Sequence, residues 1–391
     1  MHKLGIELVR LGHKLTVITG YPNYPHGKVY PGYRQKLWQR EEVEDIRVLR
    51  LPLFPDHSRS VVKRTLNYLS FSISASLLGP LVCGPADLMF VQLPPVSLML
   101  PTFLISLLRR IPFVLNMQDM WPETLPATGM VRNSLILDTV NLVARLLYKH
   151  ASAITVISDG FKKNLVAKGI SSQKIYVLPN WAYEEICQPT DSDNYLDKQS
   201  AMLGRFNVVY AGNIGPAQGL DNVIEAASML IDLPAVQFVL IGDGLDKERL
   251  ENIVKLKRFN NVLFFPRQPM SIMSFIYTLA DVLLIHLTDD PLFEITIPGK
   301  TQSCLLGGKP IIASVNGDTA DLIVDAGAGL TVPAMNPNEL NQAVRKLYAM
   351  PPQEREAMGS RGRDYYLKNL SPEVQVKKYE QLFKEIIKGR N

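Results

Sequence analysis

The chain has 391 residues, of which 47% are apolar and 20% charged, so it can form sizeable cores and is not a disordered protein. Residues 1–180 contain 21 Lys/Arg and 11 Asp/Glu, which gives a net charge of +10. Residues 181–391 contain 21 Lys/Arg and 26 Asp/Glu, which gives a net charge of −5. The basic half favours an anionic partner, although a scattered solvated surface is the alternative, and the lack of a basic run interleaved with aromatics argues against nucleic acid.

Short apolar strands alternate with helices along the chain, which is typical of α/β domains with parallel sheets. We expect strands at 15–19, 46–51, 88–92, 113–117 and 153–157, then at 207–211, 237–241, 262–265, 282–286 and 310–314. Helices are expected at 222–230, 246–257 and 372–388. The run 188–194 is polar and turn-forming. It predicts two domains, 1–185 and 206–370, with a linker at 186–205 and a terminal segment, 371–391, that packs back on the first domain.

Residues 65–108 contain a single charged side chain, Asp87, between the pairs Lys63-Arg64 and Arg109-Arg110. Glycine and proline pairs at 79–80, 84–85 and 94–95 interrupt the stretch, which argues against one clean membrane span. A buried helix–strand–helix explains the pattern, and a patch on a membrane surface is the alternative. No signal-peptide pattern occurs in the first 20 residues. The three cysteines form no CxxC, which suits a reducing cytoplasm, and no two histidines have metal-ligand spacing.

The segment 293–308 predicts a helix that begins at Pro298 and ends at Gly307-Gly308. Lys300 then lies in the first turn, beside free backbone N–H groups that suit a diphosphate. Glu294 lies just before the helix, where a carboxylate can accept hydrogen bonds from sugar hydroxyls. An ordinary capped helix is the alternative.

Two glycine-rich turns follow strands, at 210–220 and 240–245, and each is either a tight connection or a binding loop. Neither is G-x-G-x-x-G, which argues against a nicotinamide oxidoreductase. Polar residues also follow the strand at 113–117, where open α/β sheets bind ligands. Asp119 and Glu123 are acid–base candidates there, and a capped turn is the alternative.

Nine motifs in order resemble family 4 of the glycosyltransferases, which have the GT-B fold. They are Gly-His-Lys-Leu-Thr-Val-Ile-Thr (12–19), Pro-Asn-Tyr-Pro-His-Gly (22–27), Gln-Asp-Met-Trp-Pro-Glu (118–123), Ile-Ser-Asp-Gly (157–160), Leu-Pro-Asn-Trp (178–181), Tyr-Ala-Gly-Asn-Ile-Gly (210–215), Ile-Gly-Asp-Gly (241–244), Ile-Pro-Gly-Lys-Thr-Gln (297–302) and Gly-Lys-Pro-Ile-Ile-Ala (308–313). The resemblance covers nearly the whole chain and is strongest to the bacterial O-antigen, capsule and colanic-acid branch, which includes N-acetyl-L-fucosamine transferases. It implies two facing Rossmann-like domains with a cleft between them, the first binding the acceptor and the second the nucleotide sugar.

The family's paired glutamates fall on Glu294 and Gln302, which implies contacts with the donor sugar and the ribose. Two cationic positions of the family fall on Asn213 and Gln218, so Lys300 is expected to be the main diphosphate cation. The implied catalytic residues are Asp119, Glu294 and Lys300. The implied donor-binding residues are Gly212, Asn213, Gly215, Gln218, Gly242, Gly244, Arg267, Pro298, Gly299 and Gln302. The implied acceptor-side residues are Asn23, Tyr24, Gln118 (at the family's frequent histidine), Trp121 and Glu123.

The resemblance implies a cytoplasmic or peripheral inner-membrane enzyme that transfers a sugar with retention from a UDP-sugar, such as UDP-N-acetyl-L-fucosamine, to a polyprenyl-diphosphate-linked saccharide during surface-polysaccharide synthesis. No metal and no cofactor are expected. A UDP-sugar epimerase of the same fold and a non-catalytic scaffold subunit are the alternatives. Family members begin with a strand and glycine turn that precede the helix at residue 1. We therefore expect the first strand to be missing. Either the chain is truncated or its true start lies upstream of Met1, and we favour the second explanation.

Overall fold

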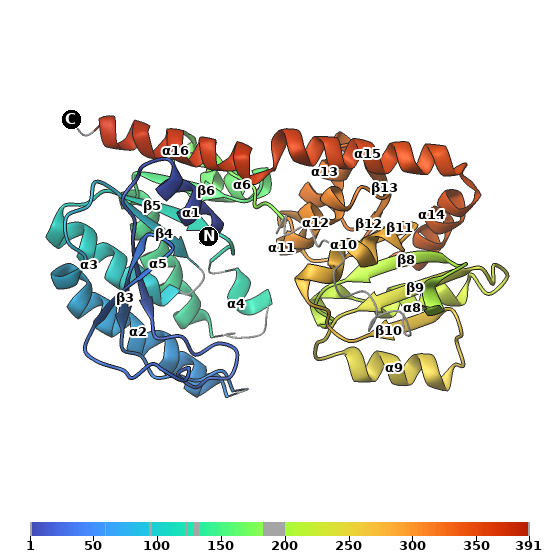
Figure 1. The fold of residues 1–391 in the computed structure, drawn as a ribbon, viewed down its shortest axis with the longest axis horizontal. Helices are drawn as coiled ribbons and strands as arrows, with labels where there is room; N and C mark the ends of the chain where they lie inside the picture. The colour runs from blue at the N-terminus through green and yellow to red at the C-terminus, as the bar shows by residue number, and fades with distance from the viewer. Residues whose placement is uncertain are drawn as a thin grey trace. The chain divides into compact units, whose positions relative to one another are not determined.

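The computed structural model describes residues 2–58, 60–93, 96–121, 123–127, 133–182 and 200–389. The chain forms two compact units, Met1–Leu178 with Val376–Asn391, and Pro179–Gln375 (Figure 1). The chain therefore passes from one unit to the other twice, once in each direction. We describe each unit by itself.

The N-terminal unit alternates strands and helices as the sequence predicts. Its strands are β1 (Thr16–Gly20), β2 (Gln39–Val43), β3 (Ile46–Leu51), β4 (Met89–Leu93), β5 (Phe113–Met117), β6 (Ala153–Val156) and β7 (Ile175–Val177). Its helices are α1 (His2–Arg10), α2 (Val61–Val82), α3 (Met99–Arg109), α4 (Thr124–Ala127), α5 (Ser134–His150), α6 (Asp159–Ala167) and α16 (Pro372–Lys388). The predicted strands of this half are confirmed to within one residue at either end.

The described strands of this unit form two sheets, β1-β3-β2 and β4-β5-β6-β7. The second sheet is parallel throughout, whereas β2 pairs antiparallel with β3. β1 and β4 each lie at the end of a sheet. Both strands are only partly buried, unlike β5, whose five residues are all buried.

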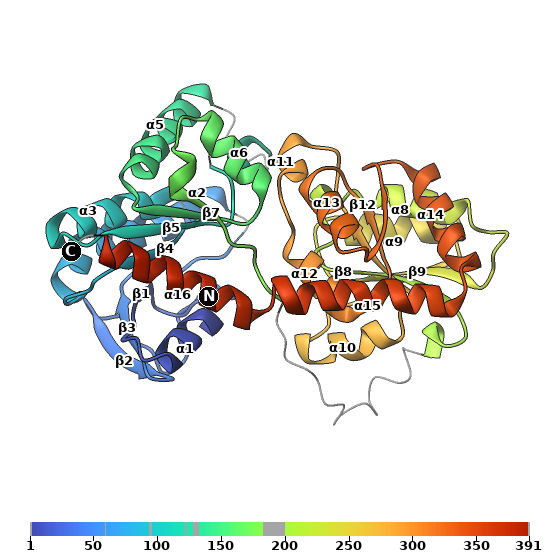
Figure 2. The same cartoon turned by 90° about the horizontal axis from the view of Figure 1, so that it is seen from above.

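The terminal helix α16 belongs to this unit from Val376 onward, although it follows the whole C-terminal unit in sequence. Tyr379 and Phe383 of α16 pack against Phe90 of β4, with ring centroids 5.6 and 5.3 Å apart. Glu380 lies 2.9 Å from His13, which follows α1, and Figure 2 shows α16 in red beside α1. An aromatic cluster around the buried Tyr379 thus holds the end of the chain on the N-terminal sheet.

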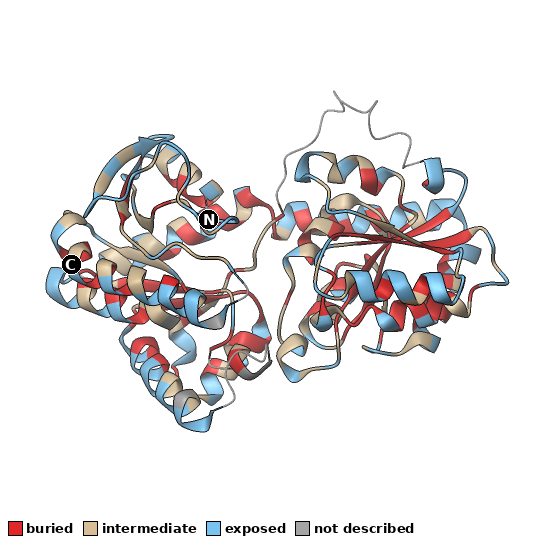
Figure 3. Ribbon diagram, turned by 90° about the horizontal axis from the view of Figure 1, so that it is seen from below, coloured by how far each residue is buried: buried red, intermediate tan, exposed pale blue. Residues whose placement is uncertain are grey.

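The C-terminal unit is one parallel six-stranded sheet in the order β10-β9-β8-β11-β12-β13. Its strands are β8 (Phe206–Ala211), β9 (Val236–Ile241), β10 (Val262–Phe265), β11 (Val282–His286), β12 (Ile311–Ser314) and β13 (Gly329–Val332). Its helices are α8 (Asp221–Ser228), α9 (Lys247–Leu256), α10 (Met270–Thr278), α11 (Pro291–Glu294), α12 (Gly299–Gly307), α13 (Asp318–Asp325), α14 (Pro337–Ala349) and α15 (Pro352–Asn369). Two buried apolar clusters, one on each face, cover the sheet, whose strands Figure 3 shows in red.

The border between the units lies earlier than the predicted end of the first domain at residue 185. Ala182 is buried in a C-terminal core cluster, and its backbone N–H donates to the Tyr366 hydroxyl at 3.1 Å. Residues 200–205 were expected in the linker, but Met202 is buried in the same cluster and its carbonyl accepts from Asn207 Nδ2 at 2.8 Å. The predicted linker residues 186–199 lie outside the described part of the chain.

Candidate functional site

Lys300 stands at the beginning of α12, as the sequence predicts. Pro298 is the N-cap, Gly299 is the first helical residue, and Gly308 ends the helix in the left-handed conformation (φ 66°). Among the described residues no side chain caps this N-terminus. The first turn of α12 therefore offers backbone N–H groups and the positive end of a helix dipole, both of which favour an anion.

The Lys300 ammonium contacts Tyr210, which lies near the carboxyl end of β8. Nζ donates to the Tyr210 hydroxyl at 3.0 Å and lies 4.2 Å from the centroid of the ring. The hydroxyl in turn donates to the carbonyl of Asn213 at 2.6 Å. Lys300, Tyr210 and the loop after β8 thus form one hydrogen-bonded chain, which fixes where the ammonium lies.

Burial lowers the pKa of Lys300 to about 8, so the group is still mostly protonated at neutral pH. No carboxylate of the described residues pairs with this ammonium. Cys304, one turn further along α12, is a neutral thiol because burial raises its pKa to about 12. A partly desolvated cation without a counter-charge is typical of a site that receives an anionic ligand.

The two glycine-rich turns lie against each other. The backbone N–H of Gly212 donates to Ile241 O, and that of Ile214 donates to Asp243 O, both at 2.9 Å. A Cβ on Gly242 would lie 1.8 Å from Gly212 O, and one on Gly244 would lie 2.2 Å from Ile214 O. Both positions have positive φ angles, so the loop contact itself requires glycine there.

A buried histidine, which the sequence analysis did not select, supports the loop after β8. His286 of β11 is fully buried, with Nδ1 2.6 Å from Gln218 O and Nε2 3.0 Å from Asn222 Oδ1. Burial lowers its pKa to about 4, so the ring is neutral at physiological pH. In the same loop, Asn213 Nδ2 donates to Gln218 Oε1 at 2.9 Å. The two residues that stand at the family's cationic positions are therefore hydrogen-bonded to each other.

Glu294 ends the short helix α11 with an exposed side chain. Its backbone is held from two sides: Gly317 (φ 70°) approaches so closely that a Cβ would lie 2.1 Å from Glu294 O, and Thr319 Oγ1 donates to Thr296 O at 3.0 Å. The backbone at Glu294 is therefore fixed, while its exposed side chain can change rotamer.

Two other predicted donor contacts are less well placed. Gln302 is 1% exposed, and one atom of its side-chain amide lies 3.0 Å from Gly299 O and 3.1 Å from Pro298 O, which assigns that atom as the nitrogen. This position does not favour the expected contact with a ribose. Arg267 is exposed after β10, the edge strand two places from β8 in the sheet.

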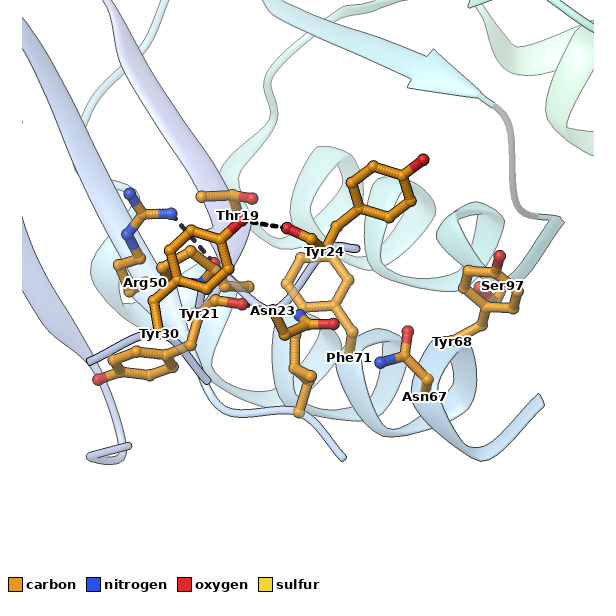
Figure 4. A pocket seen from close by; sticks show the side chains of 13 residues that line it. Thr19, Tyr21, Asn23, Tyr24, Tyr30, Arg50, Asn67, Tyr68, Phe71 and Ser97 are labelled. Carbon is orange, nitrogen blue, oxygen red and sulfur yellow. Dashed lines mark hydrogen bonds between the residues drawn. The ribbon is translucent and has the colours of Figure 1, made fainter. Parts of the chain in front are cut away.

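In the N-terminal unit, a pocket of ≈ 370 Å³ lies at the carboxyl end of β1 (Figure 4). It brings together the predicted residues Asn23 and Tyr24 with Arg50 of β3 and with α2. Asn23 is 9% exposed, and its Nδ2 donates to Tyr21 O at 2.8 Å, whereas its Oδ1 has no partner among the described residues. A buried acceptor without a donor is costly, so the pocket favours a ligand that carries hydroxyl groups.

The remaining acceptor-side candidates and the catalytic candidate Asp119 follow β5 and are not among the residues that line this pocket. Gln118 donates to Asn116 Oδ1 at 3.1 Å, and Glu123 forms an ion pair with Lys168. Trp121 is buried, and its carbonyl accepts from the Tyr148 hydroxyl at 3.3 Å. Asp119 keeps an exposed side chain, and partial desolvation raises its pKa. Among the described residues no group of three His, Cys, Asp or Glu could hold a metal.

Comparison with known proteins assigns the family. A glycosyl transferase 4-like domain model matches residues 1–181, and a model of the glycosyl transferases group 1 matches residues 191–365. The chain belongs to the GT-B glycosyltransferases of the family 4 type. A protein of Escherichia coli K12 named as a colanic acid biosynthesis glycosyl transferase, WcaI, is 26% identical over 78% of this chain and 77% of its own length.

Solved structures agree with the fold of a GT-B glycosyltransferase. Sucrose-phosphate synthase from Thermosynechococcus elongatus superposes with a TM-score of 0.71 at 17% identity, over 99% of this chain and 92% of that one. HepE of Anabaena in complex with UDP-glucose gives a TM-score of 0.65 at 16% identity, over 88% and 87% of the two chains. The glycosyltransferase assignment thus rests on family models, a curated relative and the fold.

Within this glycosyltransferase, roles for Tyr210, His286 and the pocket lining around Asn23 were not predicted from the sequence. Tyr210 lies in a buried strand that is apolar except for Asn207, so the pattern predicts a core residue there. A signal for His286 was available, since a histidine inside the apolar run 282–286 needs polar partners when it is buried.

Proposed function

We propose that this glycosyltransferase transfers a sugar, with retention of configuration, from a UDP-sugar to a lipid-linked saccharide in surface-polysaccharide synthesis. The Lys300–Tyr210–Asn213 hydrogen-bonded chain at the start of α12 is the observation that carries the donor side. It supplies a fixed cation and backbone N–H groups where a diphosphate would lie. The relation to a colanic acid transferase and the UDP-glucose complex named for HepE support the substrate classes.

In the proposed reaction, the bond between the anomeric carbon and the diphosphate oxygen breaks while the acceptor oxygen bonds on the same face. The acceptor hydroxyl proton passes to the leaving diphosphate. Negative charge grows on the diphosphate during this step. Lys300 and the first turn of α12 stabilise it without rearrangement, because the hydrogen bond to Tyr210 already fixes the ammonium.

We assign the acceptor to the pocket around Asn23. Its unpartnered Oδ1 would accept from a sugar hydroxyl, and the rings of Tyr24, Tyr68 and Phe71 offer apolar faces of the kind that pack on sugar rings. Figure 4 shows these side chains around one hollow. No metal is part of this proposal.

The test is transfer from a panel of UDP- and GDP-sugars to acceptors in a bacterial membrane extract, with wild type and Lys300→Ala. We expect product with a UDP-sugar and a loss of about 10²–10³-fold in kcat in the variant, with a smaller loss of UDP affinity. Near-wild-type transfer by Lys300→Ala would overturn the site assignment. Turnover of a UDP-sugar without acceptor would favour an epimerase, and binding without turnover a scaffold subunit.

A further inference from the structure

Helix α2 turns a continuous line of aliphatic side chains to the solvent. Its outward positions are 47–78% exposed and recur every three or four residues, which places them on one face of the helix. They are Val62, Leu66, Leu69, Ile73, Leu77 and Leu81. We call them the α2 stripe. At about 1.5 Å per residue the stripe is roughly 28 Å long.

The opposite face of α2, which packs on the unit, carries polar and small side chains. Asn67 Nδ2 donates to Phe54 O at 2.7 Å, Ser74 Oγ to Pro52 O at 2.7 Å, and Ser72 Oγ to Ser97 O at 2.5 Å. Gly79 is buried, and a Cβ there would lie 2.7 Å from Ile105. A helix that faces water normally shows the reverse arrangement. The exposed face of α2 therefore suits an apolar surrounding.

Helix α3 extends the same surface. The contacts Ser72–Ser97 and Gly79–Ile105 show that α2 and α3 pack side by side and run in the same direction (Figure 1). Before Arg109 the exposed side chains of α3 are again apolar, and they include Leu100, Phe103 and Leu107, which are 39–62% exposed. The α2 stripe with these three residues is called the docking face below. So many exposed apolar side chains on two neighbouring helices are unusual for a soluble monomer and indicate an interaction site.

Basic residues flank the docking face and no acidic residue lies on either helix. Lys63 and Arg64 stand in the first turn of α2, and Arg109 and Arg110 end α3. From residue 60 to residue 111 the only carboxylate is Asp87. An apolar centre with cationic ends matches the boundary between acyl chains and anionic headgroups.

We propose that α2 and α3 dock this protein on the surface of an anionic bilayer, with the docking face in the outer acyl region and the four basic residues at the headgroups. By length and composition α2 is also the one described helix that could cross a membrane. Docking fits better than spanning, because the hydrogen bonds of Asn67, Ser72 and Ser74 tie the inner face of α2 to the unit.

Docking would also serve the acceptor pocket, a link that rests on the proposed function. Asn67, Tyr68 and Phe71 of α2 line that pocket, and they alternate along the helix with Leu66 and Leu69 of the docking face. The same two turns of α2 thus contact both the pocket and the bilayer. A saccharide whose lipid stays in the membrane would reach the pocket without leaving the surface.

The test is sedimentation of the full-length protein with vesicles of phosphatidylcholine, with and without 30% phosphatidylglycerol, in the absence of any sugar donor. We expect binding to the anionic vesicles that weakens as salt rises. Ile73→Asp/Leu77→Asp should bind at least about tenfold more weakly, since carboxylates strongly disfavour the acyl region. Leu256→Asp, which changes a leucine 82% exposed on α9, is the matched control and should bind as wild type does.

The charges are tested separately. The affinity of Lys63→Glu/Arg64→Glu for anionic vesicles should fall roughly fivefold per removed charge. Lys255→Glu/Lys368→Glu changes two exposed lysines of the C-terminal unit and should bind these vesicles as wild type does. Unchanged melting temperatures exclude unfolding as the cause. Equal binding of Ile73→Asp/Leu77→Asp and wild type would overturn the proposal. Retention on membranes after alkaline carbonate would show a span instead, and loss of a vesicle-free dimer in the same variant would show self-association. UDP titrations report the donor site independently of all these outcomes.

Discussion

Lys300 shows how one side chain acquires its chemistry from its surroundings. The sequence places it in the first turn of a helix, which is enough to predict an anion site. Its partner Tyr210 lies 90 positions away, so no local pattern reveals that the ammonium is desolvated and fixed on a phenol. The type of site could therefore be predicted, whereas the pKa of its cation could not.

This lowered pKa predicts a pH dependence. Lys300 is charged below about pH 8 and loses its proton above it, so kcat/KM should fall on the alkaline side near pH 8 in the free enzyme. In Lys300→Arg the cation persists to much higher pH, so this limb should disappear even if the rate is lower. A pH profile of kcat/KM for both proteins checks this. An unchanged limb in Lys300→Arg would assign the titration to another group.

Glu294 gives a second prediction at this scale. Its exposed carboxylate on a fixed backbone is placed to accept hydrogen bonds from the donor sugar. Glu294→Gln keeps the shape and removes the charge, and a hydrogen bond to a charged group contributes about 1.5–3 kcal/mol. Affinity for the UDP-sugar should fall about 10–100-fold while affinity for UDP stays nearly constant. Separate calorimetric titrations of UDP and UDP-sugar measure the two, and an equal loss for both would contradict a sugar-specific role.

At the scale of elements, most of the buried parallel strands were predictable, whereas the exposed strand β2 was not. β5 and β11 are fully buried and apolar except for Asn116 and His286, and the sequence predicts their ends correctly. β2 (Gln39–Val43) is mostly charged and exposed, and its turn uses Glu44 and Asp45 at positive φ instead of the usual glycine. The border between the units lies before Ala182 for a related reason: Ala182 joins the C-terminal core through Tyr366, a contact that only the folded chain brings together.

The glycine turns predict a stability effect rather than a purely local change at the donor site. In Gly242→Ala the Cβ would lie 1.8 Å from Gly212 O, so the two loops must separate. Such overpacking costs about 1–3 kcal/mol, or several degrees in melting temperature. Gly299→Ala is the matched change, since its Cβ would meet no atom within 4 Å, and it should leave the melting temperature unchanged. Thermal unfolding of both variants checks this, and equal melting temperatures would show that the loops adapt.

At the scale of the whole chain, the N-terminal unit is completed by α16, whose residues follow the whole C-terminal unit in the sequence. Tyr379 is 1% exposed and packs on Phe90, and Val376 and Leu382 are buried beside it. The terminal helix was predictable from its pattern, and its aromatic contacts to β4 were not, because 289 positions separate Phe90 from Tyr379. Truncating a large buried aromatic side chain to alanine costs about 3–5 kcal/mol.

Tyr379→Ala should therefore destabilise the N-terminal unit selectively. Hydrogen exchange should show lost protection in β4, β5 and β6, next to the vacated site, and unchanged protection in β8 and β9 of the other unit. Lys378→Ala changes the neighbouring exposed residue on the same helix and should alter neither set. Equal loss in both units would show that they unfold as one body. Unchanged protection of β4 would show that the packing of α16 does not depend on this aromatic contact. The helix would then be attached to the N-terminal unit without forming part of its core.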